Sequence, residues 1–508
     1  MDYLIRGKFL FTQQSSYGAD GIISDGAVYV SGSEIVEIGR FRDLKSVYPT
    51  ASIVGSPRFW VMPGLVNAHQ HGKGLTQFQL GGLDEPLEIS RVRTTPTAKA
   101  PAYLDALYGA LRMIEAGVTC CLHYNSSRSA AQYRQDVEER MRAYQDAGMR
   151  VSFALDIRNR NHFVYGDNEF FASLPSPLKE QTRERYSIAR TVGPEEYFAI
   201  VQQLDGTMRD GSHDRLKLFL APAGPQWCSE DLLRALHREA DTRNLGMQIH
   251  LLETKYQRAY FQRTCGKSAV QWLDDLEFLT PQLSLAHGVW VSRDDIGLIA
   301  RRGSAVVHNP SSNLRLKSGI APVTLLHEAK VPLALGLDSS TINDDSDMFQ
   351  EMRLCANLQR MPGIGKQPIA AKAIFDMATR GGAHALGWDN SCGTLEPGKR
   401  ADLILLDARR LMQPYLSSNH HPIDTLLYRA KASDVDTVMI DGEILYRGKK
   451  HQRPAARRAA RELAGLVQPP GTTAADPLEA ALFPHVLSYY QEWDDEDLTP
   501  YHQINAAE

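Results

Sequence analysis

The stretch FWVMPGLVNAHQH, residues 59–71, joins an apolar run with the texture of a β-strand to two histidines placed two residues apart. In a strand, side chains at i and i+2 point to the same face, so His69 and His71 can reach a single metal ion at the carboxyl end of the strand. Two histidines with this spacing also occur on surface loops. The motif therefore predicts a metal site only if further ligands gather beside it.

Seven further strand-like runs follow this stretch, with helical patterns between them. The eight runs are FWVMPGLVNAH, VTCCLHY, VSFALDI, LKLFLAP, MQIHLLE, LSLAHGVW, SAVVHNP and VPLALGLD. Strands that alternate with helices in this way predict an α/β fold, a parallel (β/α)8 TIM barrel, over residues 62–390. In such a barrel, the loops after the strands form the active site.

Both ends of the chain have a different texture. The first sixty residues read as short strands broken by turn residues, and strand texture returns after residue 390 in GTLEPGKRADLILLD and VDTVMIDGEILYRGKK. Asp441-Gly442 is a two-residue hairpin signal. We predict that residues 1–61 and 391–450 form one small composite β-sandwich, and that residues 451–508 form a helical extension and tail.

The composition is that of an ordinary soluble globular protein. The 508 residues carry a formal net charge of −4, with 43% hydrophobic and 23% charged residues, so the charge does not favour a nucleic-acid partner. The sequence shows neither an apolar stretch long enough for a membrane span nor a secretory signal pattern. Its six cysteines form no CxxC pair. We expect a cytoplasmic homo-oligomer with a small-molecule substrate.

Residues of the metal-ligand type recur at the ends of later strand-like runs. They are His250 in QIHLLET, His287 in LSLAHG and Asp338 in LALGLDSS. Because the ends of barrel strands converge above the barrel, these side chains can join His69 and His71 at one point. Any one of them alone would more often be a polar residue of the core. The ordered set predicts a metal site.

The chain resembles the amidohydrolase superfamily over about residues 1–450. Within it, the chain is similar to the branch of cytosine-, guanine- and S-adenosylhomocysteine-deaminase-like and triazine-hydrolase-like enzymes. The motifs that carry the resemblance are PGLVNAHQH, HLLET, LAHG, HNPSSNLRLKSGIAP, LGLDSS and GTLEPGKRADLILLD. The resemblance implies that Glu253 is the proton shuttle and that His287 orients the attacking water or helps to hold the metal. It implies one divalent ion, Zn²⁺ or alternatively Fe²⁺, with the ligands His69, His71, His250 and Asp338.

The chemistry of this ligand set agrees with the resemblance. Three neutral imidazoles and one carboxylate leave a divalent ion with a net positive charge, which lowers the pKa of bound water toward neutrality. Asp338 can accept a proton from that water, and Glu253 can protonate the tetrahedral centre and the departing amine.

We therefore predict hydrolysis of a carbon–nitrogen bond in a small molecule, with deamination of an amino-heterocycle as the leading case. Hydrolysis of an amide, urea or carbamate and dechlorination of a triazine-like ring are alternatives. A remote alternative is a barrel that has lost catalysis and serves as a binding or assembly protein.

The candidate substrate contacts follow other strand-like runs. Many deaminases of this branch carry a histidine in a segment that resembles APHSPY, whereas this chain reads APAGPQW at residues 221–227. The missing histidine argues against a nucleoside-type substrate, and Gln226 and Trp227 are candidates to contact a flat or apolar ligand instead. Further candidates at the ends of other strand-like runs are His123, Tyr124 and Asn125, and His308 with Asn309.

Two more features bear on the site. Some superfamily members bridge two metals with a carbamylated lysine, and Lys217 lies in the corresponding strand, but it precedes the strand end by several residues. We therefore predict a single ion. The stretch from Arg158 to Thr191 is too long for an ordinary loop of the barrel. It is a candidate for a lid or pocket element, or alternatively for a surface or subunit contact.

Overall fold

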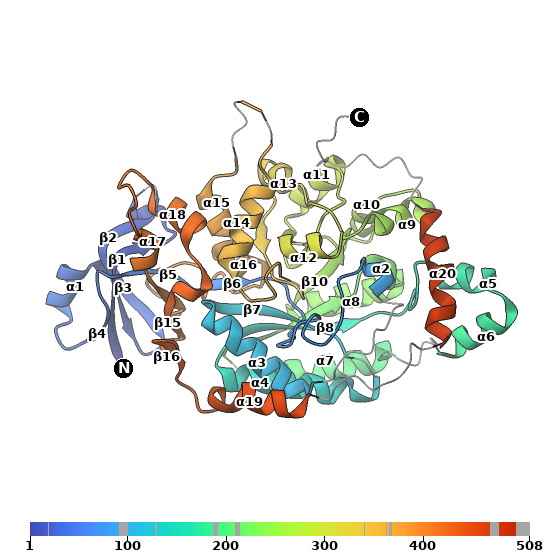
Figure 1. Cartoon of the computed structure of the whole chain (residues 1–508), viewed down its shortest axis with the longest axis horizontal. Coiled ribbons are helices and arrows are strands. Elements are labelled where there is room, and N and C mark those ends of the chain that lie inside the picture. The colour runs from blue at the N-terminus through green and yellow to red at the C-terminus, as the bar shows by residue number, and fades with distance from the viewer. Residues whose placement is uncertain are drawn as a thin grey trace.

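The computed structural model describes residues 1–18, 20–90, 100–127, 130–185, 192–208, 214–339, 341–361, 363–364, 368–467 and 477–493. Figure 1 shows an elongated molecule. A sheet built from the chain ends lies at one end, a barrel in the middle, and helix α20 at the other end beside the insertion helices α5 and α6. Among the described residues, no helix is both long enough and apolar enough to cross a membrane.

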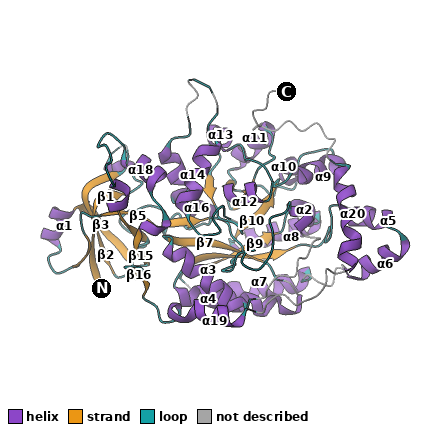
Figure 2. Cartoon of the chain, in the orientation of Figure 1, coloured by secondary structure: helices purple, strands orange, loops and turns teal. Residues whose placement is uncertain are grey.

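Eight parallel strands form the barrel, in the order of the sequence. The backbone N–H of Ala68 donates to the carbonyl of Leu335 at 2.9 Å, which brings the end of the last strand against the first. Helices surround these strands (Figure 2), and the predicted TIM barrel is confirmed. The strands are β6 (Leu65–Asn67), β7 (Val118–Asn125), β8 (Arg150–Ile157), β9 (Leu216–Pro222), β10 (Gly246–Leu251), β11 (Leu283–His287), β12 (Ala305–His308) and β13 (Leu333–Leu335).

Helices follow the barrel strands, and most of them lie outside the barrel (Figure 2). They are α3 (Ala102–Glu115), α4 (Tyr133–Ala147), α7 (Pro194–Met208), α8 (Glu230–Arg243), α9 (Lys255–Cys265), α10 (Ala269–Asp275), α11 (Arg293–Arg302), α12 (Pro310–Arg315), α13 (Val323–Glu328), α14 (Met348–Leu358), α15 (Ala371–Met377) and α16 (Arg380–Ala385). The short helix α2 (Leu87–Ser90) lies in the loop between β6 and α3.

The first strand-like run is divided between two sheets. Strand β5 (Phe59–Pro63) belongs to the second sheet and β6 to the barrel, with Gly64 between them. A Cβ atom on Gly64 would overlap the side chain of Thr119 in β7, so a glycine is needed where the chain crosses from one sheet to the other. The single barrel strand predicted from residue 59 onward is therefore wrong.

Nine strands from both chain ends form the second sheet. Strand β14 pairs antiparallel with β5, which confirms that the N-terminal strands share a sheet with strands from residues 391–450. Besides β5, the strands are β1 (Asp2–Phe11), β2 (Ile22–Ser31), β3 (Glu34–Arg40), β4 (Ser52–Gly55), β14 (Leu403–Asp407), β15 (Val435–Ile440), β16 (Glu443–Arg447) and β17 (Lys450–His451).

Alternation along β14 shows how this sheet packs. Leu403 and Leu405 lie in a core enclosed by the sheet itself, whereas Ile404 and Leu406 lie in the large core shared with the barrel. Successive side chains of a strand point to opposite faces, so one apolar strand serves both cores. The helices α1 (Phe41–Val47), α17 (Arg409–Met412) and α18 (Pro422–Arg429) accompany this sheet.

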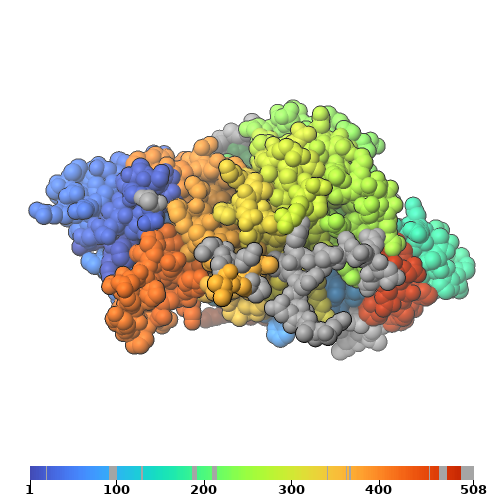
Figure 3. All heavy atoms as spheres, turned by 90° about the horizontal axis from the view of Figure 1, so that it is seen from above, coloured from blue at the N-terminus to red at the C-terminus, as the bar shows by residue number. Residues whose placement is uncertain are grey.

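Two helices form the described part of the C-terminal extension. Helix α19 (Ala456–Leu466) packs against α3, and α20 (Pro477–Gln491) packs against α6 (Ser176–Arg185) of the insertion, which also contains α5 (Asp167–Ser173). Figure 3 shows α20 and the insertion at the same end of the molecule. The stretch 468–476 and the tail 494–508 lie outside the described residues.

A buried ion pair joins the barrel to the second sheet. Arg150, the first residue of β8, donates to both carboxylate oxygens of Asp402, from Nε at 2.7 Å and from Nη2 at 3.1 Å. The same Nη2 donates to Asp441 Oδ1 at 3.2 Å. Arg150 and Asp402 are each 1% exposed. Removal of the Asp402 charge would leave the buried Arg150 with a single contact to Asp441 as its remaining carboxylate partner.

We expect Asp402→Asn to lower the free energy of unfolding by up to about 3–5 kcal/mol, because the buried Arg150 would lose the carboxylate that binds it through two oxygens and keep only Asp441. Urea unfolding of the variant and the parent protein measures this difference. Asp25→Asn is the matched control, since Asp25 pairs with Arg6 at 2.9 Å on the surface, and it should cost less than about 1 kcal/mol. Equal losses in the two variants would contradict the structural role of the buried pair.

Candidate active site

Five metal-ligand-type side chains meet at the carboxyl ends of the barrel strands. His69 and His71 follow β6, His250 lies in β10, His287 ends β11, and Asp338 follows β13. The Nε2 atom of His71 lies 3.4 Å from Nε2 of His250 and 3.4 Å from Oδ1 of Asp338. Two groups, His69 with His71 and His250, and His69 with His287 and Asp338, each have ligand atoms within 4.8 Å of one another.

Hydrogen bonds on the far side fix the orientation of three of these rings. Nδ1 of His69 lies 2.6 Å from Gln248 Oε1, and Nδ1 of His287 lies 2.9 Å from Asn313 Oδ1. Nδ1 of His250 lies 2.9 Å from the carbonyl oxygen of Ala223. Because each partner is an acceptor, Nδ1 carries the proton and Nε2 offers its lone pair at the centre of the site.

Burial keeps these imidazoles neutral. It lowers the pKa of His69 to about 4 and that of His71 to about 3, and it also lowers the pKa of His250 and of His287. Among the described residues, Nε2 of His69 and Nε2 of His287 are buried without a hydrogen-bond partner. Neutral imidazole nitrogens that lack a hydrogen-bond partner are suited to bind a divalent metal ion.

Asp338 supplies the negative charge of the cluster. Burial alone would raise the pKa of its carboxyl group, but the neighbouring histidines and a 2.6 Å hydrogen bond from the Ser312 hydroxyl lower that pKa below its usual range. The residue has a φ of +55°, and its backbone N–H donates to the carbonyl of His69 at 2.9 Å. The surrounding structure thus holds Asp338 in a conformation that non-glycine residues rarely adopt, as is common at functional sites.

Glu253 lies beside this cluster, just after β10. It is 3% exposed, and its Oε2 lies 3.7 Å from Nε2 of His287. The backbone N–H of Glu253 donates to Oε1 of Gln257 at 2.9 Å, which fixes the turn that carries the carboxylate. Glu253 therefore faces the same centre as the histidines.

A cavity of about 320 Å³ opens above the cluster. That volume falls in the range of small-molecule sites. Apolar and aromatic side chains, among them Leu87, Tyr124 and Trp227, share its wall with the carboxylate of Asp156 and with Arg158. Burial raises the pKa of Asp156 to about 7, and its Oδ1 has no hydrogen-bond partner among the described residues.

The predicted substrate contacts lie at different depths. Trp227 lines the cavity, whereas Gln226, His123, His308 and Asn309 do not. The His123 ring stacks on Phe153 with centroids 4.6 Å apart, and its Nδ1 lies 2.9 Å from the Tyr144 hydroxyl.

The other three of these residues lie behind the cavity wall. Gln226 and His308 are each 1% exposed, and Asn309 is fully buried. The side-chain amide nitrogen of Asn309 lies 3.3 Å from Nδ1 of His287, so this residue contacts the cluster from behind.

Tyr124, the neighbour of His123 in the sequence, also lines the cavity. Its ring centroid lies 4.5 Å from that of His250, and its hydroxyl donates to the carbonyl of Ala221 at 3.0 Å. Cys120 and Leu122 of the same strand point into the core inside the barrel, whereas Cys121 points into the core between the barrel and the surrounding helices. The alternation of strand β7 therefore turns Tyr124 inward and His123 outward, and this rule could have distinguished the two residues from sequence.

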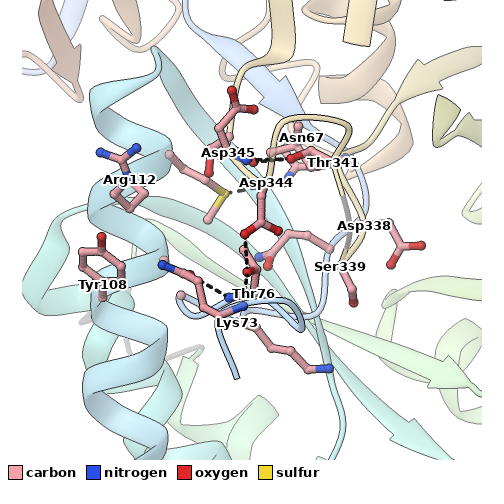
Figure 4. Close-up of a pocket in the computed structure, with 17 residues that line it drawn as sticks. Asn67, Lys73, Thr76, Tyr108, Arg112, Asp338, Ser339, Thr341, Asp344 and Asp345 are labelled. Carbon is pink, nitrogen blue, oxygen red and sulfur yellow. Dashed lines mark hydrogen bonds between the residues drawn. The ribbon is translucent and has the colours of Figure 1, made fainter. Parts of the chain in front are cut away.

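A second, smaller cavity of about 120 Å³ lies behind Asp338. Figure 4 shows the loop with Asp344 and Asp345 across from Tyr108 and Arg112 of α3, with the Thr76 hydroxyl bonded to Asp344 at 2.6 Å. Asp338 also lines the larger cavity. Asp338 therefore forms part of the wall of both cavities.

Lys217 lies far down the barrel strand. It is in register with Ser152 of β8, five residues before β9 ends at Pro222. Its ammonium group donates to the carbonyl of Gly387 and lies 4.3 Å from the centre of the Trp388 ring. Lys217 is thus placed away from the strand ends at which the histidines meet.

The barrel with a His/Asp centre at its strand ends has the architecture of a metal-dependent hydrolase. The sequence pattern of the amidohydrolase family matches residues 60–445. This chain belongs to the amidohydrolase family and hydrolyses carbon–nitrogen bonds of small molecules.

Named relatives lie in the deaminase branch of this family. The 5'-deoxyadenosine deaminase of Methanothermobacter thermautotrophicus is 32% identical over 451 residues, which cover 85% of this chain and 95% of the relative. The 5-methylthioadenosine/S-adenosylhomocysteine deaminase of Pyrococcus furiosus is 28% identical over 438 residues, which cover 84% of this chain and 92% of the relative.

A solved structure supports the divalent metal. The crystal structure of an adenosine deaminase from Xanthomonas campestris with bound zinc superimposes with a TM-score of 0.74 at 26% identity. The superposition covers 92% of this chain and 99% of the relative. Together with the His/Asp cluster, it supports a divalent metal ion in this chain.

We expect Asp156→Asn to stabilise the protein at pH 8 and to have little effect at pH 4. The folded protein keeps the Asp156 proton up to about pH 7, whereas the unfolded chain loses it near pH 4, so the buried group lowers stability increasingly as the pH rises through this window. The gain at pH 8 is up to about 4 kcal/mol. Urea unfolding at both pH values measures it, and a gain independent of pH would show that Asp156 titrates normally.

Proposed function

We propose that this protein is a hydrolytic deaminase of an amino-substituted heterocycle and that it uses one divalent metal ion. The observation that carries the proposal is the meeting of neutral imidazoles, the Asp338 carboxylate and Glu253 at the base of one cavity. A divalent ion held there would supply the positive charge that lowers the pKa of a water molecule and so activates it for attack.

We assign a separate role to each residue of the site. His69, His71, His250 and Asp338 hold the ion. Glu253, which is acidic and lies close to His287, moves a proton to the departing amine. His287, whose Nε2 faces both Glu253 Oε2 at 3.7 Å and Asp338 Oδ2 at 4.0 Å, orients the attacking water.

We assign zinc as the ion, with iron as the alternative, because the adenosine deaminase relative contains zinc. A single ion suits this chain, since Lys217 is bonded to Gly387 and lies several residues before the end of its strand. The homo-oligomer and the cytoplasmic location stay predictions of the sequence.

The cavity favours a flat substrate with hydrogen-bond donors. Tyr124 and Trp227 offer aromatic surface, and Asp156 offers a buried carboxyl oxygen that needs a donor. The names of the relatives point to adenosine derivatives. The absence of a histidine at Ala223, where many of these deaminases carry one, favours an amino-heterocycle held differently from theirs. Amide, urea and carbamate hydrolysis and triazine dechlorination are the alternatives.

We expect ammonia release from one class within a panel of 5'-substituted adenosines, aminopurines, pterins, aminopyrimidines, triazines and N-aryl ureas. Coupled measurement of ammonia and of chloride or amine release identifies the reaction. Chloride or amine without ammonia would replace deamination by one of the alternatives. Metal-loaded, folded protein that releases none of these products would favour a binding protein.

We expect His250→Ala to lose metal and activity together, because it removes a ligand between His71 and the carbonyl of Ala223. Elemental analysis should find about one equivalent of metal in the parent protein, as suits a single set of four ligands, and far less in the variant. His237→Ala is the matched control, since this histidine lies on α8 outside the site. Two equivalents in the parent would contradict the single-ion assignment.

Glu253→Gln should keep the fold and the metal, because glutamine keeps the size of the side chain but has no ionisable group. Its kcat should fall by at least about 10², the lower end of the usual contribution of general acid–base catalysis, while KM changes much less. Steady-state kinetics with elemental analysis checks both statements. Loss of metal would make Glu253 a ligand, and near-normal turnover would move the proton shuttle elsewhere, with His287 the next residue to test.

A further inference from the structure

The insertion after β8 carries a buried tyrosine whose backbone is held by the C-terminal helix. The Tyr489 hydroxyl donates to the carbonyl of Tyr165 at 2.6 Å, and the Tyr165 N–H donates to the Tyr490 hydroxyl at 3.1 Å. The rings of Tyr165 and Tyr490 are also in contact, with centroids 5.8 Å apart and nearly perpendicular. Two side chains of α20 thus satisfy both backbone groups of one residue more than 300 positions earlier.

Local contacts also fix the loop around Tyr165 in the conformation that this contact requires. Gly166 has a φ of +97°, and a Cβ atom there would lie 2.7 Å from the Tyr489 hydroxyl oxygen. The next residue, Asp167, accepts the backbone N–H groups of His162 and Val164 at 2.6 and 2.8 Å. Every one of these contacts fixes the conformation of the same short loop.

The side chain of Tyr165 points the other way, toward the active site. Its hydroxyl donates to Glu88 Oε1 at 3.0 Å and lies 3.5 Å from Nε2 of Gln257. Gln257 in turn accepts the backbone N–H of Glu253 at 2.9 Å. Glu88 belongs to α2, whose Leu87 lines the large cavity. The Tyr165 hydroxyl therefore links Gln257 to Glu88, beside a direct hydrogen bond from the Thr254 hydroxyl to the same Glu88 oxygen.

We propose that Tyr165 is a positioning residue for Glu253, and that helix α20 acts through it. The proposal rests on the proposed function in one respect, the role of Glu253 as proton shuttle. Tyr165, Glu88 and Gln257 are all nearly inaccessible to water, so a hydroxyl lost from this network has no solvent replacement. The turn at Glu253 would then shift, and small displacements of catalytic groups reduce the rate strongly.

The test is Tyr165→Phe, which keeps the ring and removes only the hydroxyl. We expect a fall of about tenfold in kcat with KM changed less than about threefold, and no change in metal content. Hydrogen–deuterium exchange of the Glu253 amide should become faster, because its acceptor Gln257 loses its neighbour. Tyr197→Phe is the matched control, since this buried tyrosine donates to the carbonyl of Leu155 and does not line the cavity.

A second variant examines the helix. Tyr489→Phe combined with Tyr490→Phe removes both hydroxyls from α20 without touching the site, and it should reproduce the fall in kcat and the faster exchange at Glu253. If Tyr165→Phe behaves like Tyr197→Phe in both measurements, Tyr165 is structural only and the proposal is wrong.

The exchange measurement separates this proposal from the proposed function. Faster exchange at Glu253 in Tyr165→Phe, in a protein that deaminates nothing in the panel, would support the positioning contact and reject the deaminase assignment. Unchanged exchange would reject the positioning contact whatever the protein hydrolyses.

Discussion

The structure depends on one constraint: polar groups can be withdrawn from water only where other groups replace the hydrogen bonds that they lose. At the barrel mouth, imidazole rings are buried so deeply that they stay uncharged, and each of three rings keeps a single acceptor at Nδ1. The opposite nitrogens of the rings converge on one point. The parallel strands supply this convergence, because their carboxyl ends all lie at one rim of the barrel.

Much of this arrangement could be predicted from sequence because it follows from regular periodicity. The ligand-type residues stand directly after apolar runs, so their places at the barrel rim follow from the alternation of strands and helices. The sheet shared by the two chain ends was also predictable, since both ends have short amphipathic strands. The division of the first run at Gly64 was not, because a strand that is apolar throughout fits either sheet equally well.

The substrate cavity was harder to predict than the cluster. His123 and Tyr124 are adjacent in sequence and both suited to bind a ligand, and only strict alternation along β7 separates them. Asp156 belongs to no recognisable motif, and its raised pKa results from burial among residues far away in the chain. The contacts of Tyr165 with Glu88 and with α20 depend on tertiary packing between segments that share no pattern, so periodicity carries no information about them.

The pairing of the insertion with helix α20 has a consequence for comparing and recombining members of this family. The family pattern ends at residue 445, yet Tyr489 and Tyr490 lie beyond it and contact a loop inside it. The two segments form one module in space although the chain separates them. A chimaera that exchanges the insertion and keeps a foreign C-terminus would bring a loop without its support, so the natural crossover unit comprises both segments together.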